Sequence, residues 1–163
     1  MFIVLYGVNN LGKSTQAKLL VERLRKEGYA AEYLKYPVYD LEPSGPLINE
    51  YLRGGNPDEL SRREVQILYA FNRTQFEPML EKKLTAGIHI VAEDYIGTGL
   101  AWGVATGVDK KFLTRLNCRL RPEDLAFVFD GERFIEATES STRLSSRWSR
   151  LQARKTSCCV STE

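Results

Sequence analysis

The sequence has few of the residues on which disulfide frameworks and metal centres depend, with three cysteines and one histidine in 163 residues. An odd number of cysteines leaves at least one unpaired, and the adjacent Cys158 and Cys159 have neither metal-ligand spacing nor easy disulfide geometry. His89 lies within an apolar run, so we interpret it as a core residue. We therefore expect a reducing, cytoplasmic setting.

Long apolar runs and a strong excess of one charge are also lacking. No stretch approaches the roughly 18 apolar residues of a membrane span, and the opening MFIVLYG has no basic flank before its short apolar run. The net charge is +2, and residues 141–163 hold five basic residues against one acid, leaving 18 of the 23 basic and 20 of the 21 acidic residues before them. We expect neither a membrane nor a nucleic acid as partner.

The chain length suits one globular domain, and its apolar runs predict a parallel sheet. Four short runs alternate with segments of helical periodicity: Phe2–Tyr6, Ala31–Tyr36, Ile88–Ala92 and Leu125–Phe129. Continuous rather than alternating hydrophobicity is typical of strands buried on both faces. The alternation predicts an α/β fold of about four parallel strands flanked by helices, with right-handed crossovers.

Helical periodicity is clearest after the first strand, where apolar residues recur from Ala17 to Leu24 and Gly28 suits the helix end. A second helix is predicted from Asp58 to about Ala86, which Pro78 should kink or divide. A short helix is expected near Leu47–Leu52, between loops rich in proline and glycine.

The strongest functional signal is Gly7–Ser14, GVNNLGKS, which fits the G-x-x-x-x-G-K-[ST] pattern between a buried strand and an amphipathic helix. Glycines let successive backbone N–H groups point at an anion, and the helix N-terminus adds partial positive charge. Lys13 should bridge the terminal phosphates of ATP, and the Ser14 hydroxyl should ligate Mg²⁺. The predicted nucleotide-binding residues are Gly7, Asn9, Asn10, Leu11, Gly12, Lys13, Ser14 and Thr15, within a P-loop NTPase fold.

This loop does not specify a reaction, because GTPases, ATPases and kinases share it. The sequence has no convincing N-K-x-D guanine signature, and it is short for a motor or transporter ATPase. Small-molecule kinases remain.

Further motifs resemble the thymidylate kinase family over roughly residues 1–130. The resemblance rests on GVNNLGKSTQ, in which Ser-Thr-Gln follows the loop lysine, and on Lys35-Tyr36-Pro37, Leu68–Arg73, Val91–Tyr95 and Thr98–Trp102 in matching order. It implies transfer of the γ-phosphoryl group of ATP to a nucleoside monophosphate, with dTMP as first choice, and a homodimer.

The resemblance also implies site residues. Lys13, Glu93 and Arg73 are the expected catalytic residues, and Glu93 joins Ser14 as a Mg²⁺ ligand. Pro37, Tyr69, Arg73 and Trp102 are the expected acceptor-binding residues. Tyr69 and Arg73 share a helix face, so the ring is placed to stack on a base while the guanidinium binds the acceptor. Core packing is the alternative for Tyr69 and Trp102.

The chain departs from the family pattern at several charged positions. Glu93-Asp94 stands where the family has Asp-Arg, so an anion replaces a cation beside the phosphates. Asn9 replaces a common acidic loop residue, Asn10 supplies no loop arginine, and Tyr39 stands where some relatives have arginine. These changes keep two alternatives open: a deoxynucleoside kinase with Glu93 as base, and an ATP-binding module without transferase activity. A pair of solvated carboxylates is the non-functional interpretation of Glu93 and Asp94.

The composition changes near Ser140, which divides the prediction into a kinase domain at 1–139 and a basic Ser/Arg-rich tail at 140–163. A mobile lid should supply cations to the transferring group, and the candidates are Arg133, Arg143, Arg147 and Arg150. The alternative is a disordered tail, since such a segment buries little apolar surface. We expect the C-terminal part of the fold to be missing or divergent, and a shifted reading frame near Ser140 is one hypothesis for it.

Overall fold

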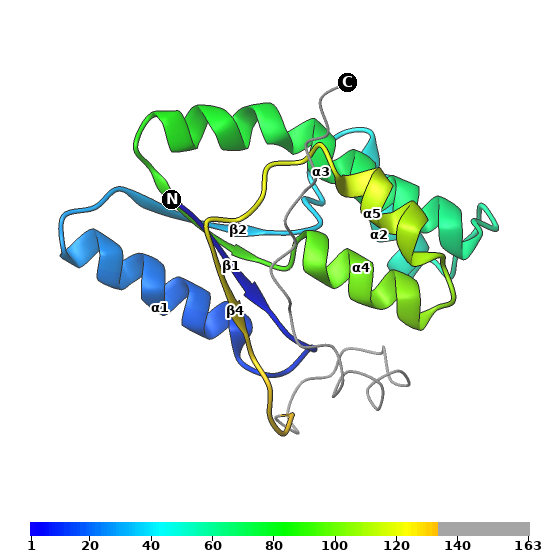
Figure 1. The fold of residues 1–163 in the computed structure, drawn as a ribbon, viewed down its shortest axis with the longest axis horizontal. Coiled ribbons are helices and arrows are strands. Elements are labelled where there is room, and N and C mark those ends of the chain that lie inside the picture. Colours follow the sequence, from blue (N-terminus) through cyan, green and yellow to red (C-terminus); the bar gives the residue numbers. More distant parts are fainter. Residues whose placement is uncertain (134–163) are drawn as a thin grey trace.

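The structure is a computed structural model that describes residues 1–133. Its centre is a sheet of four parallel strands in the order β2-β3-β1-β4 (Figure 1). The strands are β1 (Phe2–Tyr6), β2 (Ala31–Lys35), β3 (His89–Glu93) and β4 (Leu125–Val128). All three strand pairs are parallel, so the predicted α/β fold with a four-stranded parallel sheet is confirmed.

Five helices accompany the sheet in the described part of the chain: α1 (Lys13–Lys26), α2 (Ser44–Arg53), α3 (Arg62–Thr85), α4 (Ile96–Ala105) and α5 (Lys110–Asn117). Helix α1 covers one face and α3 the other, with α2, α4 and α5 gathered around the N-terminal half of α3 (Figure 1). Helix α1 ends at Lys26, and Gly28 follows at φ 88°, the left-handed conformation that glycine adopts easily. The predicted ends of this helix were therefore close to those observed.

The core has two layers because successive residues of a strand point to opposite faces. Phe2, Val4 and Tyr6 of β1 join the cluster beneath α3. Ile3 and Leu5 join the cluster beneath α1, which includes Ala17 and Val21. Full burial of β1 explains its unbroken apolar sequence.

The prediction that every strand is buried on both faces is wrong for β4. All four β4 residues are exposed, and Val128 reaches 58%. Within residues 1–133, β4 pairs only with β1 and lies at the sheet edge. An apolar run reports hydrophobicity, whereas burial depends on neighbours that the run does not specify.

The helix predictions need three corrections. Helix α3 begins at Arg62 rather than Asp58, and Pro78 lies inside one continuous helix of 24 residues instead of dividing it. Proline leaves the Thr74 carbonyl without its usual donor, but Thr74 is exposed to water. The helical segment predicted between the third and fourth strands consists of two helices, α4 and α5. The short helix predicted near 47–52 is confirmed and spans Ser44–Arg53.

Several predictions concern residues beyond the described part of the chain. The tail at 140–163, its boundary at 139, and Arg143, Arg147 and Arg150 lie outside residues 1–133, as do Cys158 and Cys159. Between Met1 and Arg133, no helix has both the length and the apolar character needed to cross a bilayer.

Candidate functional site

The predicted phosphate-binding residues form a curled loop at the carboxyl edge of the sheet. Gly7 has φ 142°, Asn10 φ 66° and Gly12 φ 76°, and α1 begins directly after Gly12. A Cβ at position 7 would lie 2.7 Å from the Phe129 carbonyl oxygen, so both space and backbone angle require glycine there. We call residues 7–14 the phosphate loop.

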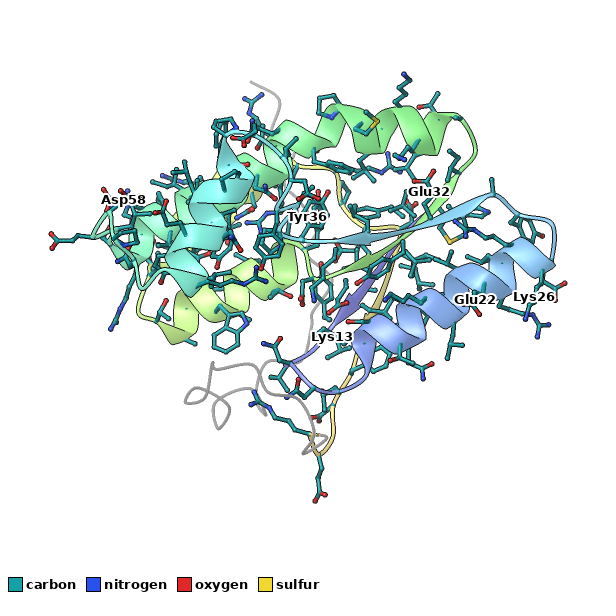
Figure 2. The ribbon with its side chains drawn as sticks, turned by 180° about the vertical axis from the view of Figure 1, so that it is seen from behind. Lys13, Glu22, Lys26, Glu32, Tyr36 and Asp58 are labelled. Atoms are coloured by element: carbon teal, nitrogen blue, oxygen red, sulfur yellow. The ribbon has the colours of Figure 1, made fainter. Side chains whose placement is uncertain are left out.

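Lys13 lies inside this loop instead of extending into solvent. Its side chain is 3% exposed, and Nζ donates to the carbonyl oxygens of Gly7 at 2.8 Å and Val8 at 2.9 Å. Figure 2 labels Lys13 where the phosphate loop meets α1. The ammonium group therefore lies next to the backbone of the phosphate loop. A cation beside such a loop is the arrangement that binds phosphates.

Two oxygen-bearing side chains meet next to Lys13, although they are 79 residues apart. The Ser14 hydroxyl donates to Glu93 Oε2 at 2.6 Å. Ser14 is the second residue of α1, and Glu93 ends β3, which is paired in parallel with β1. Hydroxyl and carboxylate oxygens are ligands that Mg²⁺ prefers, so Ser14 and Glu93 fit this ion.

Glu93 is held from several directions. Besides Ser14, the Tyr33 hydroxyl donates to Oε2 at 2.7 Å, and Lys35 Nζ lies 3.4 Å from Oε1. Burial by itself raises the pKa of Glu93, but hydrogen bonds from Ser14 and Tyr33, with the nearby Lys35 and Lys13, hold that pKa below its usual range. Glu93 is thus a buried carboxylate, 4% exposed, that remains charged, and the alternative interpretation as a solvated carboxylate is wrong for this residue.

Asp94 lies on the other side of Lys13. Its Oδ1 is 3.9 Å from Lys13 Nζ and accepts a hydrogen bond from the Thr98 hydroxyl at 2.8 Å. Burial raises the pKa of Asp94, although Lys13 and Thr98 act in the opposite direction. The residue has φ 61° at the turn into α4, a conformation that aspartate and asparagine tolerate better than most residues. Asp94 is 17% exposed, so it too differs from a solvated carboxylate.

The guanidinium of Arg73 in α3 lies against α4 and α5, and we call the buried side chains around it the chamber. Arg73 is 5% exposed, and Nη2 donates to Asn117 Oδ1 at 2.9 Å. Its Nε has no hydrogen-bond partner, and no carboxylate of residues 1–133 lies within ion-pair distance of its guanidinium. Burial lowers the pKa of Arg73 to about 10, so the guanidinium stays charged at neutral pH. A buried cation without an anion is costly unless a ligand supplies one.

Tyrosines surround this guanidinium and shape the chamber. Four of them lie close enough to favour the charged form of Arg73: Tyr95, Tyr36, Tyr6 and Tyr69. Tyr36, which follows β2 (Figure 2), has a buried hydroxyl without a partner among the described residues. A Cβ at Gly99 would lie 3.1 Å from Arg73 Nη2, so glycine lets α4 approach closely. The chamber therefore offers two unsatisfied buried polar atoms, Arg73 Nε and the Tyr36 hydroxyl.

Asn72 fixes the segment that contains Pro37. Its side chain exchanges two hydrogen bonds with the Val38 backbone, at 2.8 and 2.9 Å, and donates to the Ser44 hydroxyl at 2.9 Å. Asn72 is fully buried, so these bonds satisfy a group that is costly to leave unpaired. They tie the turn after β2 to α3, one residue before Arg73.

The remaining predicted residues lie around these two groups. Tyr69, Pro37 and Trp102 are half-buried, and Tyr69 shares an α3 face with Arg73. Asn9 and Thr15 are exposed, while Asn10, Leu11 and Gly12 are half-buried. The fold brings the two predicted residue sets, around Lys13 and around Arg73, to the carboxyl edge of the sheet.

Four contributing residues were missed as site residues: Tyr33, Asn72, Asn117 and Gly99. Tyr33 and Lys35 are two residues apart in β2 and so share a strand face, a signal visible in the sequence. Asn72 is a polar residue at helical spacing from the apolar Val65 and Leu68, which is also visible in the sequence. Asn117 and Gly99 gave no comparable signal, because their roles depend on how α4 and α5 pack against Arg73.

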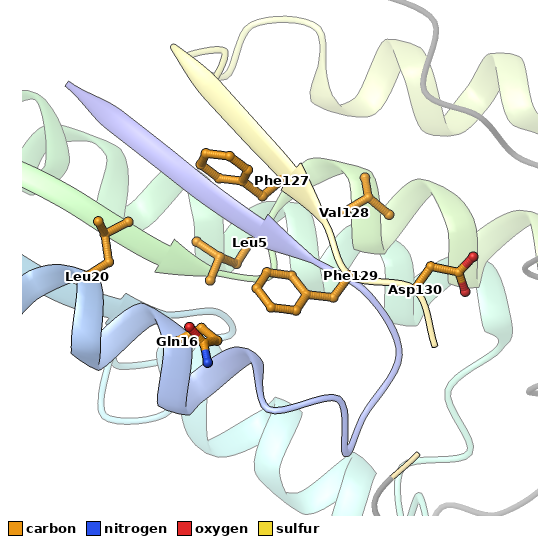
Figure 3. Close-up of a pocket in the computed structure, with 7 residues that line it drawn as sticks. All are labelled: Leu5, Gln16, Leu20, Phe127, Val128, Phe129 and Asp130. Atoms are coloured by element: carbon orange, nitrogen blue, oxygen red, sulfur yellow. The ribbon is translucent and has the colours of Figure 1, made fainter. Parts of the chain in front are cut away.

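A shallow groove of about 480 Å³ lies beside the phosphate loop, between α1 and β4 (Figure 3). Its lining consists of Leu5, Gln16, Leu20, Phe127, Val128, Phe129 and Asp130. The lining is mainly apolar and contains none of the residues that hold Lys13, Glu93 or Arg73. The groove therefore follows from the exposed position of β4, and the catalytic candidates lie elsewhere.

Comparisons with known proteins point to one family. The family profile described as "Thymidylate kinase" matches residues 5–156. A probable thymidylate kinase of Thermococcus kodakarensis is 32% identical over 154 residues, covering 90% of this chain and 72% of that protein. The human thymidylate kinase is 36% identical over 110 residues, covering 68% of this chain and 49% of the human protein.

A solved structure agrees with these sequence matches. The thymidylate kinase of Candida albicans superposes with a TM-score of 0.67 at 27% identity, over 79% of this chain and 62% of that chain. The chain therefore spans about half the length of its human relative and larger shares of the other two. A profile match over most of the sequence, with the phosphate loop and a matching fold, establishes that the chain belongs to the thymidylate kinase family.

Proposed function

We propose that this chain transfers the γ-phosphoryl group of ATP to a nucleoside monophosphate, with dTMP as the preferred acceptor. The observation that carries the proposal is the pairing of two buried cations at one edge of the sheet. Lys13 stands in the phosphate loop, and the guanidinium of Arg73 has no carboxylate of residues 1–133 within ion-pair distance. Two anionic nucleotides would satisfy both cations.

On the donor side, the backbone of the phosphate loop would bind the phosphates of ATP. Lys13 would exchange its bonds to the Gly7 and Val8 carbonyls for phosphate oxygens. Ser14 and Glu93 would hold Mg²⁺, which neutralises phosphate charge and orients the transferring group. Glu93 suits this role because it is already a charged carboxylate with its oxygen directed at Ser14.

On the acceptor side, Arg73 and the rings around it would bind the monophosphate. Tyr69 would stack on the base, while Trp102 and Pro37 would close the chamber. Arg73 would donate charge-assisted hydrogen bonds to the monophosphate, and these are stronger than hydrogen bonds between neutral groups. Asn72 would keep the Pro37 turn in place through its bonds to Val38.

Phosphoryl transfer also needs cations around the transferring group. Lys35 lies 3.4 Å from Glu93 and is half exposed, and Arg133 carries a buried Nε without a partner in the described chain. Arg143, Arg147 and Arg150 remain lid candidates outside the described residues. We propose that this set offsets Asp94, which brings negative charge to within 3.9 Å of Lys13.

Two other functions each have an observation in their favour. Glu93 is a charged carboxylate near the phosphate loop, which suits the base of a deoxynucleoside kinase acting on a sugar hydroxyl. Asp94 brings negative charge to within 3.9 Å of Lys13, which suits a module that binds ATP without transferring phosphate. Glu93 is bound to Ser14 and Tyr33, which favours the metal role over the base role.

The proposal includes a cytoplasmic homodimer. The helices α2 and α3 pack against each other, and both expose apolar side chains that support a dimer. These side chains are Leu47, Leu52, Ile67 and Phe71, each 39–48% exposed. Exposed apolar groups gathered on adjacent helices are typical of interfaces.

A coupled assay of ADP release separates these functions, with dTMP, other monophosphates and free nucleosides as acceptors. The proposal expects turnover with monophosphates, and dTMP first. Phosphorylation of nucleosides alone would support the deoxynucleoside kinase, and Mg²⁺-dependent ATP binding without turnover would support the binding module. A broad panel is needed because the Candida albicans enzyme is described as having broad substrate specificity.

Lys13→Ala tests the premise shared by all three functions. Loss of the ammonium group should weaken ATP binding at least about 10-fold, since a hydrogen bond to a charged group contributes about 1.5–3 kcal/mol. Calorimetric titration with a non-hydrolysable ATP analogue measures it, and Lys26→Ala, at the far end of α1, is the control. Unchanged affinity in Lys13→Ala would contradict nucleotide binding in this loop.

A further inference from the structure

Tyr33 contacts Glu93, one of the two predicted metal ligands. Its hydroxyl donates to Glu93 Oε2 at 2.7 Å, the same oxygen that accepts from Ser14 at 2.6 Å. The remaining carboxylate oxygen, Oε1, faces Lys35 at 3.4 Å. Ser14 and Tyr33 thus act on Oε2 from two different elements, α1 and β2.

The strand register explains why Tyr33 reaches this carboxylate. Lys35 lies opposite Glu93 across the β2–β3 pair, and Tyr33 lies opposite Val91. Tyr33 and Lys35 share one face of β2, so the long phenol extends along that face toward Glu93. The ammonium group of Lys18 in α1 lies over the Tyr33 ring, 5.7 Å from its centre, and restricts movement of the ring on that side.

The hydrogen bond from Tyr33 restricts the flexible side chain of Glu93. Glutamate has one more rotatable bond than aspartate, and each free rotamer adds an entropic cost when the carboxylate is fixed for a metal. A hydrogen bond from Tyr33 removes part of that freedom before any ligand arrives. Groups that orient metal ligands in this way commonly change metal affinity by 10- to 100-fold.

We propose that Tyr33 is a positioning residue that holds the Glu93 carboxylate in place for Mg²⁺ accompanying the bound triphosphate. The inference rests on the proposed Mg²⁺ role of Ser14 and Glu93. It requires no transfer to an acceptor, so binding alone tests it. It assigns to β2 a part in the donor site, which otherwise comes from β1, α1 and β3.

Tyr33→Phe is the direct test, with Tyr29→Phe as matched control because Tyr29 is exposed and contacts His89 rather than Glu93. Binding of a non-hydrolysable ATP analogue is titrated by calorimetry over a series of Mg²⁺ concentrations and in EDTA. Tyr33→Phe should need roughly 10-fold more Mg²⁺ for half-maximal enhancement of binding. Its affinity in EDTA should equal that of the wild type, and Tyr29→Phe should match the wild type throughout.

A double-mutant cycle with Glu93→Asp separates positioning from packing. Aspartate is too short to keep the bond to Tyr33, so Tyr33→Phe should add little to the Mg²⁺ requirement of Glu93→Asp. Additive effects would overturn the proposal, because they would mean that Tyr33 acts without Glu93. Thermal unfolding of each variant by circular dichroism identifies any loss of folding.

The outcomes distinguish this inference from the proposed function. Mg²⁺-dependent binding that shifts in Tyr33→Phe, with no phosphorylation of any acceptor, would remove the kinase function and keep the inference. Phosphorylation of dTMP with the same Mg²⁺ requirement in both phenylalanine variants would do the reverse. Nucleotide binding by the wild type that ignores Mg²⁺ would overturn the inference.

Discussion

At the scale of single residues, the site is defined by charges that folding has left without full compensation. Arg73 is buried beside an asparagine and several tyrosines but no carboxylate of the described chain. Asp94 is a largely buried carboxylate whose charge is only partly compensated by Lys13 and Lys35. Such groups reduce folding stability. Substitutions that remove them should therefore change ligand binding while leaving stability unchanged or higher.

Arg73→Met removes the unpaired charge while keeping a long apolar side chain. We expect the free energy of unfolding of the ligand-free protein to stay the same or rise by about 1 kcal/mol, because buried charges are often replaced by apolar groups without loss. The KM for the monophosphate should rise about 10- to 100-fold, the loss of a charge-assisted hydrogen bond. Urea unfolding and steady-state kinetics measure the two effects. A large loss of stability with unchanged KM would assign Arg73 a purely structural role.

Asp94→Asn tests the effect of the second carboxylate. Because burial raises the folded-state pKa of Asp94, the folded protein holds this proton more tightly than the unfolded chain. Its ionisation therefore reduces stability as the pH rises from about 4, the usual aspartate pKa, through the raised value. Asp94→Asn should be more stable than the wild type at pH 7, with the advantage disappearing below about pH 4.

Asparagine accepts the left-handed backbone at position 94, so Asp94→Asn introduces no strain there. Removing an anion 3.9 Å from Lys13 should also tighten ATP binding. Urea unfolding at pH 7 and pH 4 checks the stability effect, and calorimetry checks the affinity. Asp58→Asn, at an exposed loop far from the site (Figure 2), is the control. Weaker ATP binding in Asp94→Asn would show that Asp94 contributes to the donor site.

At the scale of elements, α3 contributes Arg73 to the chamber, and capping of the helix N-terminus stabilises α3. The Ser61 hydroxyl accepts from the Glu64 backbone N–H at 3.3 Å, and the Glu64 carboxylate accepts from the Ser61 N–H at 2.7 Å. This capping box satisfies two donors that a helix start leaves free. Ser61 is 12 positions before Arg73, so the cap acts on the helix without touching the chamber.

Ser61→Ala should lower the free energy of unfolding by about 1 kcal/mol. Ser61→Asp keeps a capping oxygen and should lose only a small part of that. Urea unfolding compares the two variants, and the KM for the acceptor should be the same in both. An equal loss of stability in Ser61→Ala and Ser61→Asp would mean that the hydroxyl does not cap α3.

At the scale of the whole molecule, two groups of exposed apolar side chains lie on neighbouring or adjacent residues. One is the β4 edge, where Leu125, Phe127 and Val128 are exposed. The other is the outer surface of α2 and α3, where Ile67 and Phe71 lie one helical turn apart. We place the proposed dimer contact on the second surface, because it draws exposed apolar side chains from two helices that pack against each other.

Phe71→Glu should convert a dimer to a monomer of about 18.6 kDa, measured by sedimentation equilibrium. A buried carboxylate at an interface lacks solvation, which opposes association. Leu19→Glu, which changes an equally exposed apolar residue on α1, should leave the dimer intact. Dissociation by Leu19→Glu alone would move the contact to the α1 face.

The sequence by itself determined the phosphate loop, the four strands and the residue sets around Lys13 and Arg73. These features depend on local spacing: a glycine pattern between a strand and a helix, unbroken apolar runs, and residues one helical turn apart. Only the tertiary structure decided the strand order, the exposure of β4 and the contacts of Glu93 with Ser14 and Tyr33, 79 and 60 residues away. Such contacts depend on which elements become neighbours, and neighbours are set by the packing of the whole chain.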